Sequence, residues 1–321
     1  MNTERERLLA NVPGPDGWQH WGPFLSERQW GTVREDYSPG GTAWEYFPHD
    51  HARSRAYRWG EDGIAGISDA EQLVCLSLAM WNGADPILKE RLFGLTNAQG
   101  NHGEDVKEHY FYLDAAPTHS YLKMLYKYPQ VEFPYADLVA ENARRGTLVP
   151  EYELLDTGVF AEDRYFDVFV EYAQAAPGDI LMKITAWNRG GAPAVLHLLP
   201  QLVLRNTWTW EPGTVKPTLR ALSDGAVGIE PADLGVSRLY FDGEAKLLFT
   251  ENESNAPRLW NTGGAGYFKD GFHERIVGGR IDRVNPAEIG TKAGVWFHST
   301  IAPGGGSWPG SPLSQRGISR Q

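Results

Sequence analysis

Apolar and polar residues alternate along several short segments in the middle of the chain. In residues 164–172 (RYFDVFVEY), apolar side chains occupy every second position, with Asp167 and Glu171 among the residues between them. A period of two is typical of a β-strand with one buried face. Two further apolar segments follow after pairs of turn residues: DILMKITAWN (179–188) and AVLHLLPQLVLRNTWTW (194–210). Extended segments at this short spacing predict an antiparallel all-β fold.

Special residues in and near these segments predict where strands turn or break. Pro200 interrupts the segment 194–210, and because proline has no backbone N–H, we expect a bend, a bulge or an edge position there. Residues 238–253 (RLYFDGEAKLLFTENE) carry Asp242-Gly243 between two apolar arms, which predicts a β-hairpin. Residues 292–306 (KAGVWFHSTIAPGGG) predict a strand that enters a turn. No partner strand is recognisable after it, so we expect an unpaired edge there.

Residues 68–96 carry two conflicting patterns. Ser68 and Glu71 have the spacing of a capping box, which favours a helix. Apolar residues alternate between positions 74 and 80, however, and Asn82-Gly83 separates this run from a second apolar run. The alternation and the turn favour a hairpin over the helix.

One segment carries strong helix signals. In residues 133–146 (FPYADLVAENARRG), Pro134 opens the segment, and Arg144 and Arg145 stand in its last turn before Gly146. Proline at the start and cations at the end are typical of a helix. The patterns together predict a mainly β protein, a large antiparallel β-sandwich with few short helices.

Composition narrows the classes of function. The 321 residues include 30 Lys and Arg against 41 Asp and Glu, a net charge of −11, so we expect neither a nucleic-acid nor an anionic-membrane partner. No run approaches the roughly 20 apolar residues of a membrane helix. Cys75 is the single cysteine, and residues 1–20 contain no signal-peptide pattern, so we expect a cytoplasmic protein without a cysteine metal site. The aromatic content, with 12 Trp, 14 Tyr and 13 Phe, suits a sheet core or flat platforms for sugar rings.

Two stretches, 21–38 and 43–63, concentrate charged and aromatic residues. Indoles stack on sugars or guanidinium groups, and glycoside hydrolysis needs two carboxyl groups across the scissile bond. The alternative is that each acid neutralises an arginine and fixes a loop. The arginines are Arg28, Arg34, Arg53, Arg55 and Arg58; the acids are Glu27, Glu35, Asp36, Glu45, Asp50, Glu61 and Asp62; the indoles are Trp21, Trp30, Trp44 and Trp59.

Two other groups have the residue types of a binding site. His49 and His51 would point the same way in a strand and could share a metal ion, although the nearby arginines would repel it and a structural role is favoured. The loop 97–109 holds His102, Glu104 and Asp105, which could contact a ligand or lie at a solvated hairpin tip. Gly-x-Ser-x-Gly, P-loop and His-Glu-x-x-His motifs are absent, which disfavours serine hydrolases, NTPases and zincins.

Several long blocks occur in an order that resembles a known family. They are WGPFLSERQWGTVREDYS, YFPHDHARSRAYRWGEDGIAGISD, WNGADPILKERLFGLTNAQGNHGEDVKEHYFYLDAAPTHSYLKMLYKYPQ, LLDTGVFAEDRYFDVFVEYA and LHLLPQLVLRNTWTW. They resemble the N-terminal portion of bacterial members of glycoside hydrolase family 63, relatives of the mannosyl-oligosaccharide glucosidases. The resemblance implies an N-terminal super-β-sandwich at residues 18–302, which a C-terminal (α/α) barrel would follow. It also implies inverting hydrolysis of α-glucosidic bonds by an Asp acid and a Glu base on that barrel.

This chain ends where the barrel would begin, so the resemblance places no catalytic residue in it. We therefore expect an inactive, non-catalytic N-terminal domain, with an extension at 1–17 and an irregular, truncated or frame-shifted tail at 303–321. Its partners would be the missing barrel and an α-glucoside or oligosaccharide, and we expect no cofactor and no metal. The expected contacts with sugar or barrel are Arg28, Trp30, Arg34, Glu35, Asp36, Trp44, Arg55, Trp59, Glu61 and Asp62.

Two alternatives remain open from the sequence. The same indoles could serve a stand-alone carbohydrate-binding β-sandwich module. His49 and His51 could instead belong to a metal-dependent enzyme.

Overall fold

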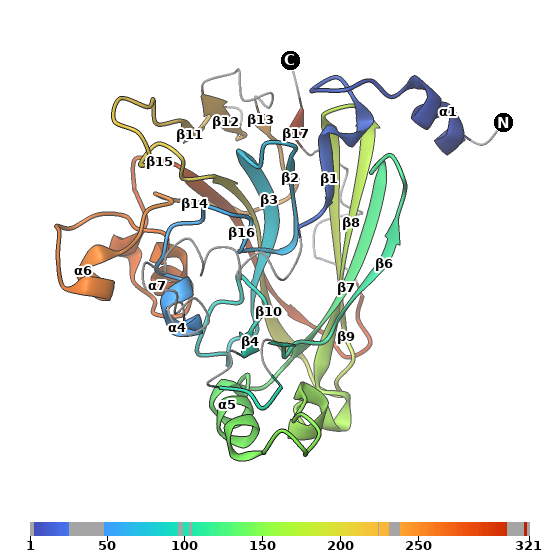
Figure 1. The fold of residues 1–321 in the computed structure, drawn as a ribbon, viewed down its shortest axis with the longest axis vertical. Coiled ribbons are helices and arrows are strands. Elements are labelled where there is room, and N and C mark those ends of the chain that lie inside the picture. The colour runs from blue at the N-terminus through green and yellow to red at the C-terminus, as the bar shows by residue number, and fades with distance from the viewer. Residues whose placement is uncertain are drawn as a thin grey trace.

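The computed structural model of this protein describes residues 3–25, 48–95, 99–102, 105–223, 225–230, 238–306 and 318–319. Within them, two large antiparallel sheets pack against each other, and short helices lie around their rims (Figure 1). The fold is a mainly β sandwich, as the alternating pattern predicts.

The smaller of the two sheets has six strands. Its order places strands from distant parts of the chain side by side. That order is β1 (Trp21–Phe24), β2 (Ile64–Asp69), β3 (Val74–Trp81), β10 (Ala194–Leu204), β16 (Lys292–Ile301) and β14 (Lys246–Thr250).

The larger sheet has nine strands. They are, in order, β15 (Ile289–Gly290), β11 (Thr218–Ala221), β12 (Val227–Glu230), β13 (Arg238–Leu239), β17 (Ile318–Ser319), β9 (Asp179–Asn188), β8 (Tyr165–Ala176), β7 (Tyr121–Pro129) and β6 (Tyr110–Ala115). A separate ladder joins β4 (Gly94–Leu95) to β5 (Asp105–Val106). This antiparallel pair confirms the hairpin that was one interpretation of the loop 97–109.

The helices of the described residues are short. In Figure 1, α4, α6 and α7 lie together beside the six-stranded sheet, α5 lies at the lower end, and α1 projects near the N-terminus. The α-helices are α1 (Thr3–Ala10), α4 (His49–Ala52), α5 (Tyr135–Arg144), α6 (Ala256–Trp260) and α7 (Gly271–Ile276). The 3₁₀ turns are η1 (Trp18–His20), η2 (Leu154–Thr157), η3 (Ala161–Asp163) and η5 (Ile281–Arg283). None of the helices in these ranges is long and apolar enough to cross a membrane.

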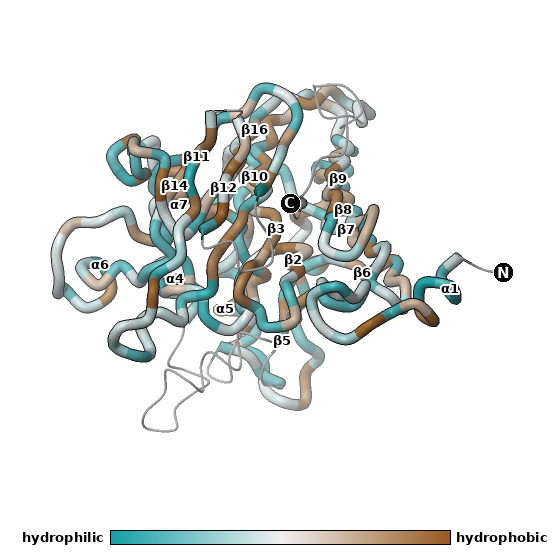
Figure 2. Tube along the Cα trace, turned by 90° about the horizontal axis from the view of Figure 1, so that it is seen from above, coloured by the Kyte–Doolittle hydropathy of each residue, from teal (hydrophilic) through white to brown (hydrophobic). Residues whose placement is uncertain are grey.

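The main core lies between the two sheets. Leu76 of β3 and Leu198 of β10 belong to the same buried cluster as Phe166 and Val168 of β8. Figure 2 shows hydrophobic residues concentrated on central strands such as β2 and β3, whereas many loops are hydrophilic. Burial of these apolar side chains stabilises the sandwich by about 25 cal/mol for each Å² removed from water.

A second cluster covers the opposite face of the six-stranded sheet. Ala79 of β3, Leu199 of β10 and Leu248 of β14 pack with Phe272 and Ile276 of α7. This packing holds α7 against the sheet, and the polar segments on either side of α7 are thereby brought close to β2, β3 and β16. The candidate site lies along this edge.

The structure confirms the strands predicted at 164–172 and 179–188 and the helix predicted after Pro134. The third predicted segment, 194–210, forms a strand only as far as Leu204. The structure corrects two of the three alternatives expected at Pro200, the edge position and the bulge. This proline lies in β10, an interior strand, and its register with β3 is unbroken from His197 to Leu204. On the other side, the pairing with β16 omits Leu199 and Pro200 and then resumes in the same register. A local gap in one ladder, rather than an edge position, accommodates the missing N–H.

Two further expectations were wrong. The arms on either side of Asp242-Gly243 do not form a hairpin, because β13 joins the nine-stranded sheet and β14 the six-stranded one. The turn therefore connects two layers. The strand at 292–301 is no unpaired edge either, since β16 pairs with both β10 and β14. Within the tail after residue 303, Ile318–Ser319 forms β17.

In residues 68–96 the strand interpretation was right and the helix was wrong. Asp69 and Gln72 make a tight turn between β2 and β3, and the Asp69 carboxylate accepts a hydrogen bond from the Val74 N–H at 2.7 Å. After Asn82-Gly83 the chain returns to β3 through one bridge, between Met80 and Lys89.

Candidate functional site

The predicted contact residues fall into two groups. Arg28, Trp30, Arg34, Glu35, Asp36 and Trp44 lie outside the described residues. Arg55, Trp59, Glu61 and Asp62 lie on the segment that joins α4 to β2, and Arg55, Glu61 and Asp62 are buried. We refer to residues 53–63, between α4 and β2, as the predicted segment. The candidate site consists of this segment and of the residues that pack against it.

A single buried amide fixes the middle of the segment. Asn252 accepts a hydrogen bond from the Tyr57 N–H at 2.7 Å, and its Nδ2 donates to the carbonyl oxygens of Tyr57 and Leu204, each at 2.8 Å. Its own N–H donates to Thr291 Oγ1 at 2.7 Å. Asn252 thus ties the segment to the end of β10 and to the start of β16.

Glu61 shapes the turn that precedes β2. Its carboxylate accepts hydrogen bonds from the backbone N–H groups of Arg58 at 3.0 Å and Trp59 at 2.6 Å. Burial, followed by the neighbouring charge of Asp62, raises the pKa of Glu61 to about 6. This carboxylate is committed to the backbone of its own loop.

Asp62 forms a buried ion pair with Lys269, a residue just before α7. The Lys269 ammonium also donates to the carbonyl oxygen of Ala52 at 3.1 Å, and Arg91 lies 4.0 Å from the other oxygen of Asp62. Lys269 and Asp62 are 3% and 9% exposed. The pair therefore joins α4, the predicted segment and α7 in a place that water hardly reaches.

A second buried pair lies beside the first. Glu90 binds the ammonium of Lys292, which also donates to the carbonyl oxygen of Lys269 at 3.2 Å. Burial lowers the pKa of Lys292 because the charged form is desolvated. We refer to the six buried charges as the ionic seam: Glu61, Asp62, Glu90, Arg91, Lys269 and Lys292.

The ionic seam holds three carboxylates and three cations, so its formal charges balance. Isolated buried charges are very unfavourable, whereas pairs with good hydrogen bonds offset much of the desolvation cost. Among the described acids of the predicted segment, Glu61 is bound to backbone and Asp62 to Lys269. These contacts favour a structural role for Glu61 and Asp62 over a role as general acid or base.

Residues 82–91 bring Glu90 and Arg91 into this place. Asn82 Oδ1 accepts hydrogen bonds from the N–H groups of Ala84 and Asp85, at 2.8 and 2.7 Å. Asp85 in turn accepts from the hydroxyls of Tyr128 and Tyr135, at 3.0 and 3.2 Å, and burial raises its pKa. The turn is therefore anchored to β7 and α5 before the chain reaches the ionic seam.

Another buried pair lies on the α5 side of this turn. Lys89 binds Glu108 at 2.9 Å, and its ammonium lies 3.5 Å from the ring centre of Phe133. Glu108 also accepts from the Tyr126 hydroxyl at 2.6 Å. Lys89 and Glu90 thus point to different partners and bridge the two polar regions.

The metal hypothesis at His49 and His51 is wrong in its geometry. The two residues lie in helix α4 rather than in a strand, so they do not share a strand face. The His49 ring packs on Tyr135 and Phe93, with centroids 5.3 and 4.9 Å away. Asp50 between the histidines pairs with Arg53 and Arg258; burial opposes the effect, but the two arginines hold the pKa of Asp50 below its usual value.

Trp59 belongs to an aromatic stack at the surface. Its ring lies 5.2 Å from that of Trp210 at an interplanar angle of 27°, and the guanidinium of Arg205 lies over both rings. Trp210 is 43% exposed. Arg55 makes a similar contact with the exposed Trp260, at 5.4 Å from the ring centre. Trp59 and Arg55 thus make arginine–indole contacts, but their partners, Arg205 and Trp260, lie more than 140 residues away and outside the two stretches from which such contacts were predicted.

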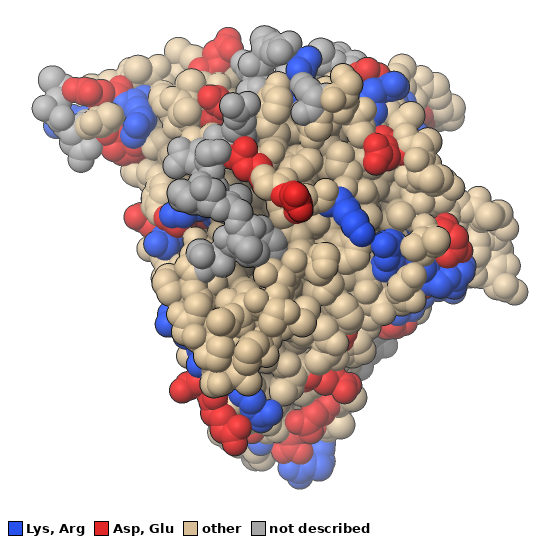
Figure 3. Space-filling model, turned by 180° about the vertical axis from the view of Figure 1, so that it is seen from behind, with Lys and Arg blue, Asp and Glu red and all other residues tan. Residues whose placement is uncertain are grey.

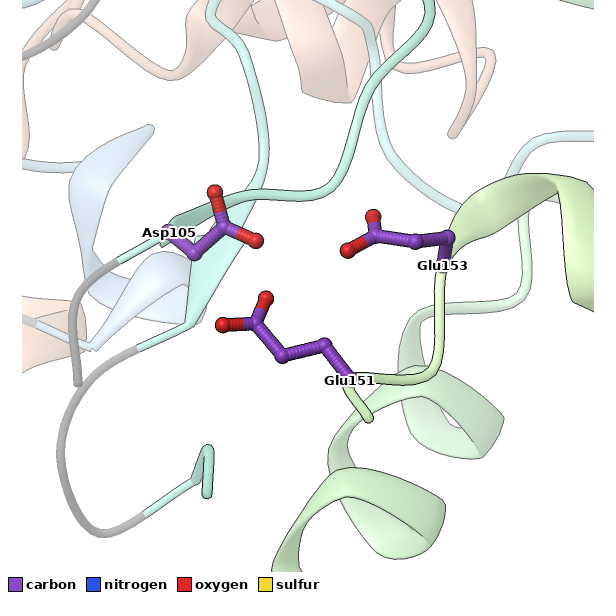
Figure 4. A group of neighbouring side chains, drawn as sticks. All are labelled: Asp105, Glu151 and Glu153. Carbon is purple, nitrogen blue, oxygen red and sulfur yellow. The ribbon is translucent and has the colours of Figure 1, made fainter. Parts of the chain in front are cut away.

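A second group of acids lies where the loop around residues 99–107 meets the segment that carries Glu151 and Glu153. Asp105, Glu151 and Glu153 converge from two segments, as Figure 4 shows. The ammonium of Lys107 binds all three, at 2.5, 2.5 and 2.9 Å. Lys107 thus occupies the position that a metal ion would take; we refer to these four residues as the Lys107 cluster. His102 Nε2 donates to the carbonyl oxygen of Val149 at 2.9 Å, and Glu104 lies outside the described residues.

Sequence reasoning missed four members of the ionic seam: Glu90, Arg91, Lys269 and Lys292. The contact of Lys269 with Asp62 and that of Lys292 with Glu90 each span about 200 positions of the chain. One signal was present: Lys89, Glu90 and Arg91 form a charged triplet between the apolar residues of PILKERLF. Three charges within an apolar run indicate buried pairs, since charged residues are rarely buried alone.

Comparison with known proteins adds one relative. The chain is 44% identical over 341 aligned residues to the uncharacterized protein YMR196W of Saccharomyces cerevisiae (strain ATCC 204508 / S288c). The alignment covers 94% of this chain and 31% of the yeast protein, so the chain spans about a third of the length of the relative it matches. No family model matches the chain, and no solved structure matches it.

Proposed function

We propose that this chain is the non-catalytic N-terminal domain of an inverting α-glucosidase-type glycoside hydrolase. The observation that supports it most is the ionic seam. The acids of the predicted segment are committed to internal partners, which suits a rigid surface that faces another domain. The acid and base would then be carried by an (α/α) barrel, the substrate would be an α-glucoside or oligosaccharide, and the protein would act in the cytoplasm.

The length of the yeast relative agrees with this proposal. The alignment covers 31% of that protein, so more than two thirds of the yeast protein lies outside the matched region. The face seen in Figure 3 offers a broad uncharged area between charged rims, as a domain that packs against another would.

A reconstitution experiment tests the proposal. The matched region of the yeast protein and the remainder of that protein are produced as separate chains, and hydrolysis of α-linked gluco-oligosaccharides is measured alone and after mixing. We expect the remainder to be inactive or weakly active alone and to gain activity with its partner. Full activity of the remainder alone, without association, would contradict the proposal.

The chain described here provides the second arm of the test. We expect no α-glucosidase turnover from it. Turnover that disappears in Glu61→Gln, but not in a matched variant of the exposed Glu211, Glu211→Gln, would place a catalytic acid in this domain instead. Circular dichroism of both variants separates loss of a catalytic group from loss of the fold.

The stacked pair Trp59 and Trp210 supports a second candidate, a stand-alone carbohydrate-binding module. Exposed indoles offer flat apolar faces on which sugar rings stack. Calorimetric titration with α-linked gluco-oligosaccharides distinguishes the two functions. Binding that is lost in Trp210→Ala, and kept in Trp260→Ala on the similarly exposed indole of α6, would favour the module; Trp30→Ala tests one of the two other predicted contact indoles, Trp30 and Trp44.

A further inference from the structure

A pocket of about 250 Å³ opens between α6, the loop after it and α7. It borders the predicted segment, because two of its lining residues are hydrogen-bonded there: Asp270 to Ser54 of that segment, and Arg258 to Asp50 of α4. The volume lies somewhat below the usual 300–1,000 Å³ of pockets for drug-sized ligands, so it suits a ligand with a single ring.

One side of the pocket is fixed by a closed hydrogen-bond network. The Ser54 hydroxyl donates to Asp270 Oδ2 at 2.6 Å, and Asn255 Nδ2 donates to the same oxygen at 2.9 Å. Arg258 donates to Ser54 Oγ and to Asp50 Oδ2, both at 2.9 Å. These groups have partners of their own, so this side is held in place before any ligand arrives.

Two other lining groups are available to a ligand. Among the described residues, no hydrogen bond or ion pair involves the carboxylate of the half-buried Glu274. Arg283 has one ion pair among the described residues, from its Nε to Oδ2 of the chain neighbour Asp282 at 3.4 Å, and this contact is not a hydrogen bond. The pocket thus offers a carboxylate acceptor and a guanidinium donor of opposite charge.

The half-buried Phe268 adds an apolar wall between these groups. Gly266 lies against this ring: a Cβ at position 266 would be 3.1 Å from Phe268 Cζ. A second close approach shapes the pocket at Gly271, where a Cβ would lie 2.3 Å from the carbonyl oxygen of Arg283. Glycine at both positions lets backbone, rather than side chains, line the space.

We propose that this pocket binds one ring of a neutral, hydroxyl-rich ligand of hexose size. A hydroxyl group can donate to the Glu274 carboxylate while a neighbouring hydroxyl accepts from the Arg283 guanidinium. The apolar face of the ring lies on Phe268. The lining holds two arginines, Arg258 and Arg283, and two carboxylates, Asp270 and Glu274, so its formal charges balance and a neutral ligand leaves no charge uncompensated.

The inference rests on the proposed function only for the choice of ligand. The pocket would serve as an outlying subsite that holds part of a longer oligosaccharide near the predicted segment. A single ring held by two charge-assisted hydrogen bonds and one stacking contact gives a dissociation constant of about millimolar.

The experiment uses this chain and three probes: D-glucose, myo-inositol and L-serine. Binding is followed by ligand-observed NMR and titrated by calorimetry. We expect D-glucose to bind, and its affinity to fall about tenfold or more in Glu274→Gln and in Phe268→Ala, because each variant removes one of the contacts. Glu211→Gln, the same chemical change at an exposed glutamate outside the pocket, should leave the affinity unchanged.

Three results would overturn the inference: no binding of D-glucose or myo-inositol, sugar binding that survives both pocket variants, or binding of L-serine in preference to the two neutral rings. The last result would assign the pocket to a zwitterion. None of these results affects the reconstitution experiment, so failure of the pocket and failure of the proposed function are separate outcomes. Unchanged thermal unfolding of the variants confirms that they are folded.

Discussion

The ionic seam and the Lys107 cluster handle charge in different ways. The ionic seam balances three carboxylates with three cations, and each of its members is less than a tenth exposed. The Lys107 cluster places three carboxylates around one ammonium, but their side chains are 26% to 48% exposed. Water stabilises the excess negative charge in the second case and cannot do so in the first. The comparison shows that burial, rather than the number of charges, decides whether the charges of a cluster must balance.

The largest effect should follow from breaking one pair of the ionic seam. Lys292→Met leaves Glu90 charged and buried, so we expect the free energy of unfolding to fall by about 3–5 kcal/mol. The double variant with Glu90→Gln should recover much of this loss because the unpaired charge is gone. Denaturant unfolding of both variants measures the effect, with Lys246→Met on the exposed part of β14 as the control. A loss below about 1 kcal/mol in Lys292→Met would mean that the seam is not desolvated.

Glu61 should give the ionic seam a dependence on pH. Its pKa is about 6 in the folded protein against the ordinary value of 4.5 for a glutamate, so the folded state binds the proton more tightly. The resulting stabilisation is complete below about pH 4.5 and is lost as the pH rises through about 6. Relative to the parent, Glu61→Gln should therefore gain stability, on the order of 2 kcal/mol, between pH 4 and pH 7.

Unfolding by denaturant across this pH range measures the difference between the two proteins. Glu211→Gln is the control, because its glutamate is exposed. A constant difference between parent and Glu61→Gln over the whole range would show that Glu61 titrates normally.

The Lys107 cluster should respond more weakly, and in a way that a metal ion can reverse. Lys107→Met leaves three carboxylates in mutual repulsion, but they are partly solvated, so we expect a loss of about 1–2 kcal/mol. Oxygen ligands of this kind suit Ca²⁺, and millimolar calcium should restore part of the stability. Thermal unfolding with and without calcium tests this. An equal response of the parent protein to calcium would contradict the idea that Lys107 takes the place of the ion.

The smallest effect should appear at the exposed Asp50. Asp50 pairs with Arg53 and Arg258, but its side chain is 61% exposed. Asp50→Asn should therefore cost less than about 1 kcal/mol, measured by the same denaturant method. A loss as large as that of Lys292→Met would remove the distinction between buried and exposed pairs.

Local sequence patterns predicted the strands and the principal helix but not how the strands are arranged. The alternation in 164–172 depends only on which face of one strand is buried, so it can be read directly. Asp242-Gly243 has the local features of a hairpin turn, yet its arms enter different sheets because each finds its partner elsewhere: β13 beside β12 and β14 beside β16. Pro200 is tolerated in an interior strand because the gap is confined to one side.

The same limit applies to the candidate site. The density of charge in 43–63 indicated a structured polar region, and Glu61 and Asp62 are indeed buried there. Their roles could not be predicted, because the deciding partner Lys269 is 207 positions away from Asp62. A run of acids and arginines looks the same in sequence whether its charges bind a substrate or each other.

The order of the six-stranded sheet also determines when its core can be completed during synthesis. In this sheet β3 lies between β2 and β10, and β16 follows β10. More than a hundred residues separate the end of β3 at Trp81 from the start of β10 at Ala194. At roughly 5–20 residues per second, the apolar face of β3 waits on the order of 10 seconds for β10 to be made. During that interval β2 is the one described strand already made that pairs with β3 in the finished sheet. The strand order therefore delays completion of the core during synthesis. We expect the yield of folded protein in the cell to depend on the speed of translation as well as on stability.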